Sequence, residues 1–357
     1  MNHTGVIYRS KLTDPFLNLA AEDHLLRSRP VYERGLMLYV NDPAVVIGRH
    51  QNPWVECNPE YLGRAGIALA RRQSGGGTVY HDSGNLNFSI LSAREQYDQN
   101  ANFDVVIEAL QTIGVRAERS GRNDLVCGEY KVSGSAFKHL RDRSFHHGTL
   151  LVGADLTRLH AALRPAAADI NSRGIASVRS AVVNLIDLAP GSIAKSSATA
   201  PKSTRVSALC AALADALIAA FVRQWGAHDG CRDPRGGVNS PRDYGGSAIS
   251  SCEIDSTFVA AHPWIRRRAE EYRAWNWVYG KTPRFEQALG LGEEAARLHV
   301  ERGRIVEVDL NGAAANAGAE AWRERVLGVE YSPAISLLRP ALPDNAPQEE
   351  PLWSIAD

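Results

Sequence analysis

The 357-residue sequence predicts an α+β fold with a mixed β-sheet flanked by helices, and its composition and length predict a substantial core and two domains. Segments with helical periodicity and short strand-like runs both occur, but they do not alternate strictly as they would in a doubly wound sheet. Hydrophobic residues make up 44% of the chain and charged residues 22%, as in a globular domain with a substantial core. The length favours a large domain followed by a smaller one.

The first half of the chain contains two predicted helices and several strands. Asp14 and Pro15 have the residue types of an N-cap and a first helical position, and the helix FLNLAAEDHLLRS follows them. The runs LMLYV and AVVIG predict two short strands. In VVIEALQTIG, apolar residues recur on one helical face, and Gly114 is a candidate C-cap. Further strands are predicted at LNFSIL, KVSGSAF and TLLVG.

In the second half, a long amphipathic helix is predicted from Val206, because apolar residues recur every three or four positions until Gly226. The segments PGSIAKSSATAPKST and GAHDGCRDPRGGVNSPRDYGG, on either side of this helix, are rich in Gly, Pro, Ser and charge and predict surface loops. The stretch RLHVERGRIVEVDLNG predicts a hairpin that turns at Gly303.

These patterns predict a large domain at residues 1–262, a small α/β accessory domain at 263–340 and a Pro- and acid-rich mobile tail at 341–357. Lys and Arg total 40 and Asp and Glu total 40, whereas a nucleic-acid binder is usually basic. The five cysteines lack C-x-x-C spacing, which argues against a zinc site and a disulfide framework and fits a reducing compartment. No targeting segment is visible, and no apolar run approaches the roughly 20 residues that span a bilayer. We expect a monomer without a nucleic-acid or membrane partner.

The stretch RRQSGGGTVYHD is the first candidate for ligand binding. Gly75, Gly76 and Gly77 have no Cβ, so their backbone N–H groups can turn toward an anion and a nucleotide can lie against the chain. Arg71 and Arg72 would supply the charged fork for a phosphate or carboxylate. The alternative is a glycine-rich turn between exposed arginines. Neither the dinucleotide motif G-x-G-x-x-G nor the P-loop motif is matched.

The strand KVSGSAF is the second candidate. In an extended segment Lys131, Ser133 and Ser135 project from one face while Val132 faces the core, so a lysine is presented among small residues beside Gly134. A ligand-binding lysine and a solvated surface lysine both fit this pattern.

Three other groups of polar residues are candidate ligands. Asn123 and Asp124 could hold a nucleotide or its magnesium ion, or could form an Asx-turn. His146 and His147 lack a third ligand at metal spacing, which favours histidines that pack within a strand. In WVYGKTPRF, a tryptophan stands where a P-loop requires glycine, so the Gly-Lys-Thr is not a phosphate site.

Seven blocks of the sequence together carry a resemblance: NLAAEDHLLR, VVIGRHQNPWVECN, ARRQSGGGTVYHDSGNLNFSI, SGRNDLV, KVSGSAFKHLRDRSFHHGTLLVGADLTRL, GIASVRSAVVNL and WNWVYGKTPRF. In this order, from about residue 5 to about 190 and again from about 264, the chain resembles the lipoate-protein ligase A and lipoyltransferase family. The resemblance implies a catalytic domain of the biotin/lipoate ligase type, followed by a small accessory domain. In that family lipoate and ATP give lipoyl-AMP and pyrophosphate, and the lipoyl group then passes to a lysine of an acceptor.

Residue by residue, the resemblance places nucleotide contacts on Arg72, Gly77, Thr78, Val79 and Tyr80, and an essential lysine on Lys131. That lysine would sit between the lipoate carboxylate and the α-phosphate of ATP, without a covalent enzyme intermediate. With the candidates named above, the predicted ATP and lipoyl-AMP site is Arg72, Gly75, Gly76, Gly77, Thr78, Val79, Tyr80, Asn123, Asp124 and Lys131. Of these, Lys131, Gly76 and Gly77 would also contact lipoate, and Asp124 would bind Mg²⁺.

The leading hypothesis is an ATP-dependent lipoate ligase that performs both half-reactions. A lipoyltransferase that uses preformed lipoyl-AMP or a lipoylated donor is the alternative, and a non-catalytic scaffold or a biotin ligase fits the sequence less well. The resemblance implies acceptors among lipoyl domains of 2-oxoacid dehydrogenase E2 subunits and the glycine cleavage H protein. The expected compartment is the mitochondrion in a eukaryote and the cytoplasm in a bacterium.

Overall fold

A computed structural model describes residues 5–30, 33–121, 123–165, 170–189, 200–226, 249–289, 296–310 and 317–333. The chain divides into two compact units. Unit 1 comprises Met1–Ala166 and Gly174–Pro283, and unit 2 comprises Ala167–Arg173 and Arg284–Asp357. The segments predicted as surface loops lie largely outside the described residues, and the predicted tail lies wholly outside them.

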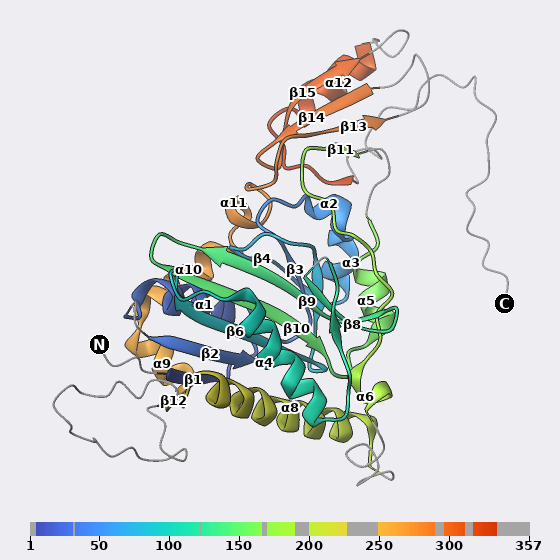
Figure 1. The fold of residues 1–357 in the computed structure, drawn as a ribbon. Helices are drawn as coiled ribbons and strands as arrows, with labels where there is room; N and C mark the ends of the chain where they lie inside the picture. The colour runs from blue at the N-terminus through green and yellow to red at the C-terminus, as the bar shows by residue number, and fades with distance from the viewer. Residues whose placement is uncertain are drawn as a thin grey trace, which may run out of the picture. The chain divides into compact units, whose positions relative to one another are not determined.

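Unit 1 is built on an eight-stranded mixed sheet in the order β12-β1-β2-β6-β10-β9-β8-β7 (Figure 1). β1 is parallel to both of its neighbours, and the other strand pairs are antiparallel. The strands are β1 Gly5–Ser10, β2 Arg34–Tyr39, β6 Asn85–Ala93, β7 Glu118–Arg119, β8 Asp124–Cys127, β9 Tyr130–His139, β10 Arg143–Leu151 and β12 Ile249–Ile254. The predicted α+β class with a mixed sheet is therefore confirmed.

Helices cover both faces of this sheet because alternate strand residues point to opposite sides. On one face, α4 (Gln99–Thr112) and α8 (Lys202–Trp225) pack against residues such as Leu36 and Phe88. On the other face, α1 (Pro15–Ser28) and α10 (Pro263–Arg273) pack against residues such as Met37 and Phe145. The remaining helices of this part of unit 1 are short, namely α6 Leu185–Leu188, α9 Ser256–Ala261 and α11 Trp275–Val278.

A three-stranded sheet in the order β4-β3-β5 carries the glycine-rich stretch. Its strands are β3 Ala44–Ile47, β4 Ala68–Arg71 and β5 Val79–His81, and its apolar residues pack with α3 (Pro59–Arg64) and α5 (Leu156–Ala162) in a separate cluster. α2 (Pro53–Glu56) follows β3. The three glycines lie in the connection between β4 and β5, so both ends of the loop are held in one sheet.

Local chemistry sets the helix ends as predicted. The Asp14 carboxylate accepts hydrogen bonds from the N–H groups of Phe16 and Leu17 at the start of α1. α4 ends before Gly114, which has φ +78°, and α8 ends at Gly226.

The length of α8 corrects the expectation that no apolar segment approaches the length needed to span a bilayer. Over 24 residues it is long and apolar enough to cross a bilayer, the one helix of this kind among the residues that the structure describes. Its apolar residues, including Leu213, Leu217 and Phe221, are buried in the core cluster with α4. Length and composition alone are weak evidence for a membrane span, and the packing explains the hydropathy of this helix.

The boundary between the units lies at Pro283, and not at the expected 262/263. The reason is that α10 packs along α1, with Ile265, Ala269 and Tyr272 buried in the same cluster as Leu25 and Leu26. The segment that begins at Pro263 therefore belongs to unit 1 by its contacts.

Unit 2 contains a four-stranded antiparallel sheet in the order β11-β13-β14-β15 and helix α12. The predicted hairpin is present, and it turns at Gly303, which has φ +73°. The edge strand β11 comes from a distant part of the chain, which the sequence patterns did not predict. The elements are β11 Ile170–Ser172, β13 Phe285–Leu289, β14 Ala296–Glu301, β15 Arg304–Leu310 and α12 Ala317–Val326.

His146 packs within the core of unit 1, as predicted for a strand histidine. Its ring lies 4.7 Å from the rings of both Phe103 and Phe137, and neither ring nitrogen has a hydrogen-bond partner among the described residues. Burial, and to a lesser degree the nearby His147 and Arg119, lowers the pKa of His146 to about 3. The ring is therefore neutral in the folded protein at every pH above this value.

We predict that His146 makes the fold acid-sensitive. Below pH 6.5 the unfolded chain binds a proton at this position, and the folded chain does not. The contribution of His146 to the free energy of unfolding is therefore fully present above pH 6.5, and it falls by about 1.4 kcal/mol per pH unit as the pH decreases toward 3. In His146→Phe, the loss of unfolding free energy between pH 7 and pH 5 should be smaller than in the wild type by about 2 kcal/mol. Urea titrations at both pH values measure this, with His160→Phe on the surface as the control. An unchanged pH dependence in His146→Phe would contradict the assignment.

Candidate functional site

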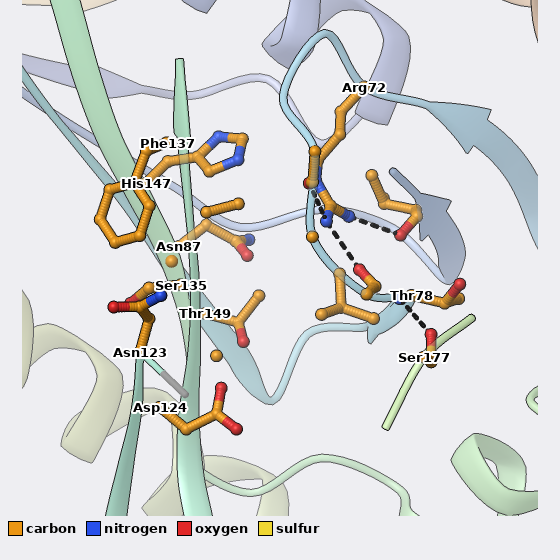
Figure 2. Close-up of a pocket in the computed structure, with 18 of the residues that line it drawn as sticks. Arg72, Thr78, Asn87, Asn123, Asp124, Ser135, Phe137, His147, Thr149 and Ser177 are labelled. Atoms are coloured by element: carbon orange, nitrogen blue, oxygen red, sulfur yellow. Dashed lines mark hydrogen bonds between the residues drawn. The ribbon is translucent and has the colours of Figure 1, made fainter. Parts of the chain in front are cut away.

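A cavity of about 350 Å³ lies in unit 1 between the glycine-rich loop and strands β9 and β10. Figure 2 shows Arg72 and Thr78 on one side of this cavity, and Asn87, Phe137 and His147 on the other. Most of the predicted site residues line it, namely Arg72, Gly75, Gly76, Gly77, Thr78, Val79, Asn123, Asp124 and Lys131. A volume of this size suits a small organic ligand.

Arg72 organises the backbone of the loop. Its guanidinium donates to the carbonyl oxygens of Gly75 (2.7 Å) and Gly77 (2.6 Å), and also to Val46 O (3.0 Å). The C=O and N–H groups of a trans peptide point in opposite directions. By fixing these carbonyls on its own side, Arg72 therefore turns the N–H groups of Gly76 and Thr78 away from itself. Arg72 also lines the cavity, so the nucleotide contact expected of it stays a prediction, and the structure adds the role of orienting the loop.

Gly76 fills a position that needs glycine for two reasons. Its φ is +82°, in the left-handed region, and a Cβ there would lie 3.2 Å from the Cβ of Ala136 on β9. The backbone of Gly48 also lies against Gly76, because a Cβ on Gly48 would be only 2.3 Å from Gly76 O. Close contact on both sides explains the glycines at positions 48 and 76, whereas a Cβ at Gly75 would meet no atom within 4 Å. The loop is therefore packed within the protein at Gly76 as well as lining the cavity.

A chain of hydrogen bonds anchors the loop to α1 and β10. Arg72 Nε donates to Ser74 Oγ (2.9 Å), Ser74 contacts His147 Nε2 (2.8 Å), and His147 Nδ1 contacts Glu22 Oε1 (2.9 Å). Because the Glu22 carboxylate can only accept, Nδ1 of His147 carries a proton, and Nε2 lies at hydrogen-bond distance from Ser74 Oγ. The order of groups is that of a hydrolase triad, but Ser74 is 1% exposed and its oxygen already accepts from Arg72, which argues against a nucleophile.

Lys131 lies on the cavity side of β9, with its ammonium 3.0 Å from Asp124 Oδ1. The predicted alternation of this strand holds for Val132, which is buried in the core, and for Lys131 and Ser135, which both line the cavity, but it is wrong for Ser133. The pairing register of β8 with β9 shifts between Leu125 and Val126, so Val132 has no partner and the side chain of Lys131 passes over Gly134. A Cβ at Gly134 would lie 3.0 Å from Lys131 Nζ. Ser133, expected beside the lysine, is completely buried.

Asn123 and Asp124 form the end of the site near Lys131. Asn123 has φ +66°, and its side-chain oxygen accepts from Gln99 (2.8 Å) and Arg119 (3.1 Å), as in a structured turn. Asp124 is the one acidic residue among the described residues that line the cavity. No group of three or more metal-ligating side chains occurs in the described parts of the chain. A metal here would thus need ligands from the substrate, as Mg²⁺ bound to phosphates does.

Two predicted residues lie outside the cavity. Tyr80 points to the opposite face of β5 from Val79 and His81, and is buried in the cluster with Val45. Arg71 is completely buried, and its guanidinium binds backbone carbonyls away from the cavity. The prediction that the Arg71 guanidinium binds a ligand in the cavity is therefore wrong. The side chain of Tyr80 does not line the cavity, so a ligand contact there could involve only its backbone.

The cavity also contains residues that were not predicted as ligands. His147 was interpreted only as a packing residue, yet it lines the cavity, and so does His81. Alternation along Val79-Tyr80-His81 would have indicated His81. The other additional lining residues are Leu19, Tyr39, Val46, Asn87, Gly134, Ser135, Ala136, Phe137, Gly148, Thr149, Ile175, Ala176, Ser177 and Val178.

One segment of this lining, residues 175–178, comes from far along the sequence and is called the strap here. Ser177 Oγ accepts from Thr78 N–H (2.8 Å) and donates to Glu56 Oε2, and Ser177 N–H donates to Glu56 Oε1 (3.0 Å). Gln51 Nε2 also donates to Ser177 Oγ (2.9 Å). Ser177 thus occupies one of the two loop N–H groups that Arg72 orients, and Glu56 holds it there.

We predict that Ser177→Ala loosens this contact. The variant loses a hydrogen bond to a buried carboxylate and also the acceptor for Thr78 N–H. These losses correspond to about 1.5–3 kcal/mol, so local opening of the strap should be roughly 10- to 100-fold more frequent. Hydrogen–deuterium exchange should show faster exchange in peptides covering Thr78 and the strap, and no change in Ser207→Ala on the exposed face of α8. Equal exchange rates in both variants would show that the strap is held by other contacts.

Together, the fold and the cavity define a class of protein. The Gly76 N–H that Arg72 orients and the Lys131 ammonium belong to the lining of one cavity. The residues that line it include no exposed nucleophile with a general base, so the arrangement suits binding and alignment of anionic reactants. A model of the lipoyl protein ligase A/B catalytic domain matches residues 14–202, which is more than half of the chain. The chain belongs to this family.

Among curated proteins, the chain is similar to lipoate-protein ligase A of Psychrobacter cryohalolentis. The two are 38% identical over 330 residues, which cover 91% of this chain and 88% of the relative. The fold resembles that of P. falciparum LipL1 in complex with lipoate (TM-score 0.59, 24% identity, 92% of this chain and 91% of that chain). It also resembles lipoate-protein ligase A bound with ATP (TM-score 0.56, 22% identity, 77% and 98%).

Proposed function

We propose that this protein is a lipoate-protein ligase that activates lipoate with ATP to lipoyl-AMP and transfers the lipoyl group to a lysine of a lipoyl domain. The observation that carries the proposal is that Lys131 and the loop from Gly75 to Thr78 line the same cavity. The identity to lipoate-protein ligase A over nearly the whole chain supports it.

In the first half-reaction, a carboxylate oxygen of lipoate attacks the α-phosphorus of ATP, an acyl–phosphate bond forms, and pyrophosphate leaves. Both reactants are anions and repel each other until a cation lies between them. The Lys131 ammonium supplies that cation, and the N–H of Gly76, the oriented loop N–H that Ser177 does not occupy, stabilises the charge on the phosphate. In the second half-reaction the acceptor amine attacks the acyl carbonyl and AMP leaves. Neither step needs a covalent enzyme intermediate, in agreement with the buried Ser74.

Mg²⁺ would enter this site with the phosphates of ATP. The residues present fit such an ion in a limited way, because Mg²⁺ needs only one or two protein carboxylates when phosphates and water complete its shell. Asp124 is the candidate ligand, and it would have to leave or share the ion pair with Lys131. When bound, the ion would offset the charge that develops on the leaving pyrophosphate.

The proposed acceptors are the lipoyl domains of 2-oxoacid dehydrogenase E2 subunits and the glycine cleavage H protein. A fold neighbour of this chain is a bipartite lipoate protein ligase studied with its E2 lipoyl domain, from Thermoplasma acidophilum (TM-score 0.56, 22% identity, 78% of this chain and 96% of that chain). Because the curated relative is bacterial, we propose the bacterial cytoplasm as the compartment and a monomer as the working form.

The decisive experiment is pyrophosphate release by the purified protein with lipoate, ATP and Mg²⁺. Release that depends on lipoate supports the ligase. Transfer from synthetic lipoyl-AMP to a lipoyl domain without pyrophosphate release would instead assign a lipoyltransferase. The absence of both reactions would overturn the proposal.

A further inference from the structure

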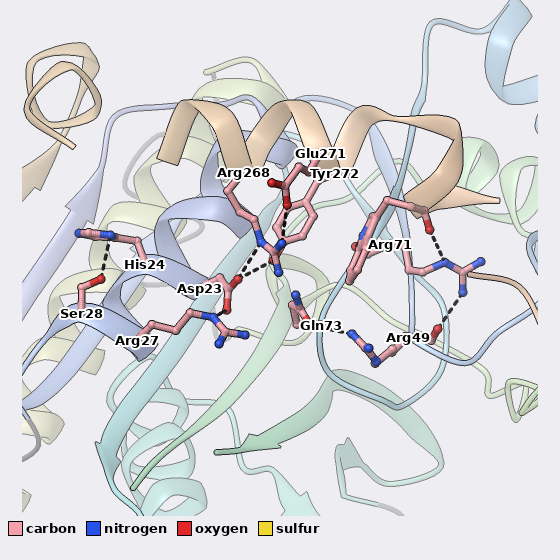
Figure 3. A network of polar contacts seen from close by, with 11 residues as sticks. Asp23, His24, Arg27, Ser28, Arg49, Arg71, Gln73, Arg268, Glu271 and Tyr272 are labelled. Atoms are coloured by element: carbon pink, nitrogen blue, oxygen red, sulfur yellow. Dashed lines mark hydrogen bonds and ion pairs between the residues drawn. The ribbon is translucent and has the colours of Figure 1, made fainter. Parts of the chain in front are cut away.

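A cluster of four cations on unit 1 lies beside the glycine-rich loop and takes no part in lining the cavity. It consists of Arg27 on α1, Arg49 after β3, Lys138 on β9 and Arg268 on α10 and is called the basic face here (Figure 3 shows its three arginines). Arg27 and Arg268 share one carboxylate, Asp23, at 2.7 and 3.0 Å. Arg268 also pairs with Glu271.

The other two cations have no carboxylate partner. Arg49 donates to the neutral amide of Gln73 (2.8 Å), and Lys138 has no ion pair or hydrogen bond within the described parts of the chain. Burial is the main cause that lowers the pKa of Lys138, and the positive charge of Arg49 is the second. Arg27 and Arg268 lower this pKa further, whereas the carboxylate of Asp23 raises it. Four positive charges therefore face two negative ones. The whole chain has no net charge, so this imbalance is a local feature.

Aromatic rings lie among these cations. The guanidinium groups of Arg49 and Arg268 each lie 5.5 Å from the Trp277 ring, and Arg268 lies 5.7 Å from the Trp264 ring. Arginine and tryptophan are both enriched in protein–protein binding sites, where tryptophan buries a large apolar area and arginine supplies charge. A surface used only for solubility would keep its cations apart and solvated.

The basic face adjoins the candidate active site through the chain itself. Lys138 follows Phe137, which lines the cavity, and Gln73, the partner of Arg49, precedes the loop from Ser74 to Gly77. A protein bound here would hold its side chains close to the cavity. The side chains of Arg27 and Arg268 are 39% and 19% exposed, so both can contact a partner without rearrangement.

We propose that the basic face is the docking surface for an acidic protein acceptor, whose carboxylates pair with Arg49 and Lys138 while its target lysine reaches the cavity. This rests on the proposed function, because the partner is taken to be the lipoyl acceptor. Carboxylates on the partner would form ion pairs with Arg49 and Lys138, the two cations that have no carboxylate partner within this chain. These ion pairs would increase the affinity, and the long-range attraction would increase the association rate.

The test measures docking and chemistry separately. Arg49→Glu, Lys138→Glu and their combination are compared with the neutral variants Arg49→Gln and Lys138→Gln, and with Arg64→Glu on the exposed end of α3 as a matched control. Binding of a fluorescently labelled E2 apo-lipoyl domain is measured by anisotropy. We expect the Kd to rise about tenfold for each reversal, less for each neutral variant, and not at all for Arg64→Glu.

Lipoate-dependent pyrophosphate release in the absence of acceptor should be unchanged in these variants. In the wild type the Kd should also rise with NaCl concentration, and this dependence should be weaker in the double reversal. Equal Kd values and equal salt dependence in the wild type and the double reversal would overturn the docking proposal. If the wild type releases no pyrophosphate, the proposed ligase activity fails, while the binding measurement still decides the role of the basic face. The neutral variants decide it if a reversal does not fold.

Discussion

Lys131→Ala is expected to lower lipoate-dependent pyrophosphate release by about 10²- to 10³-fold, the cost of removing one preorganised charge-stabilising donor. The ammonium is placed by three features of the structure: the bulge in β9, the open space over Gly134, and the ion pair with Asp124. Alanine removes the cation and leaves the strand intact. Transfer from synthetic lipoyl-AMP should fall as well, if the same cation stabilises the leaving AMP.

The matched control is Lys11→Ala, whose side chain is 60% exposed and pairs only with Glu253 at the surface. Binding of the acceptor to Lys131→Ala should remain within about twofold of the wild-type affinity, because the basic face is unchanged. Pyrophosphate release within threefold of the wild type would refute the role assigned to Lys131. Normal release with loss of transfer alone would place the lysine in the second half-reaction only.

Arg71→Met is expected to destabilise unit 1 by about 3 kcal/mol or more, and to lower the Tm by roughly 5–10 °C. The Arg71 guanidinium donates to five carbonyl oxygens and one hydroxyl, those of Gly48, Arg49, Gln51, Trp277, Val278 and Thr282. Methionine fills much of the same volume but leaves these buried acceptors without donors, which is the costly part of the change.

Arg71 is charged at neutral pH, since burial lowers its pKa only to about 10. No carboxylate contacts it among the described residues, so the carbonyl dipoles alone compensate the charge. Calorimetry of Arg71→Met against Arg64→Met, an exposed arginine at the end of α3, measures the effect. The control should change by less than about 0.5 kcal/mol. A Tm for Arg71→Met equal to that of the control would show that water or other donors replace the guanidinium.

Features that depend on neighbours in the chain could be predicted from the sequence. The cap at Asp14, the left-handed Gly114 and the turn at Gly303 follow from the chemistry of a few adjacent residues, and all three are present. The same holds for the glycine-rich loop and Lys131 as candidate ligands, because their residue types and spacing already restrict what they can do.

Features that depend on distant partners could not be predicted. The sequence presents Arg71 and Arg72 as an equivalent pair, but the first is tied to Val278, 207 positions away, and the second to Gly75 and Gly77. Likewise, a contact with Glu22, 125 positions away, holds His147 in the site. The strap is held there by the contact between Ser177 and Glu56, which are 121 positions apart.

The sequence by itself thus determined the fold class, the family resemblance, and part of the set of residues that line the cavity. Only the tertiary structure decided which arginine orients the loop, which face of β9 presents Lys131, and which cations remain without a counter-charge. The physical reason is that residue type and periodicity report local backbone preference, whereas a hydrogen bond or an ion pair exists only when folding brings its two partners within a few ångströms.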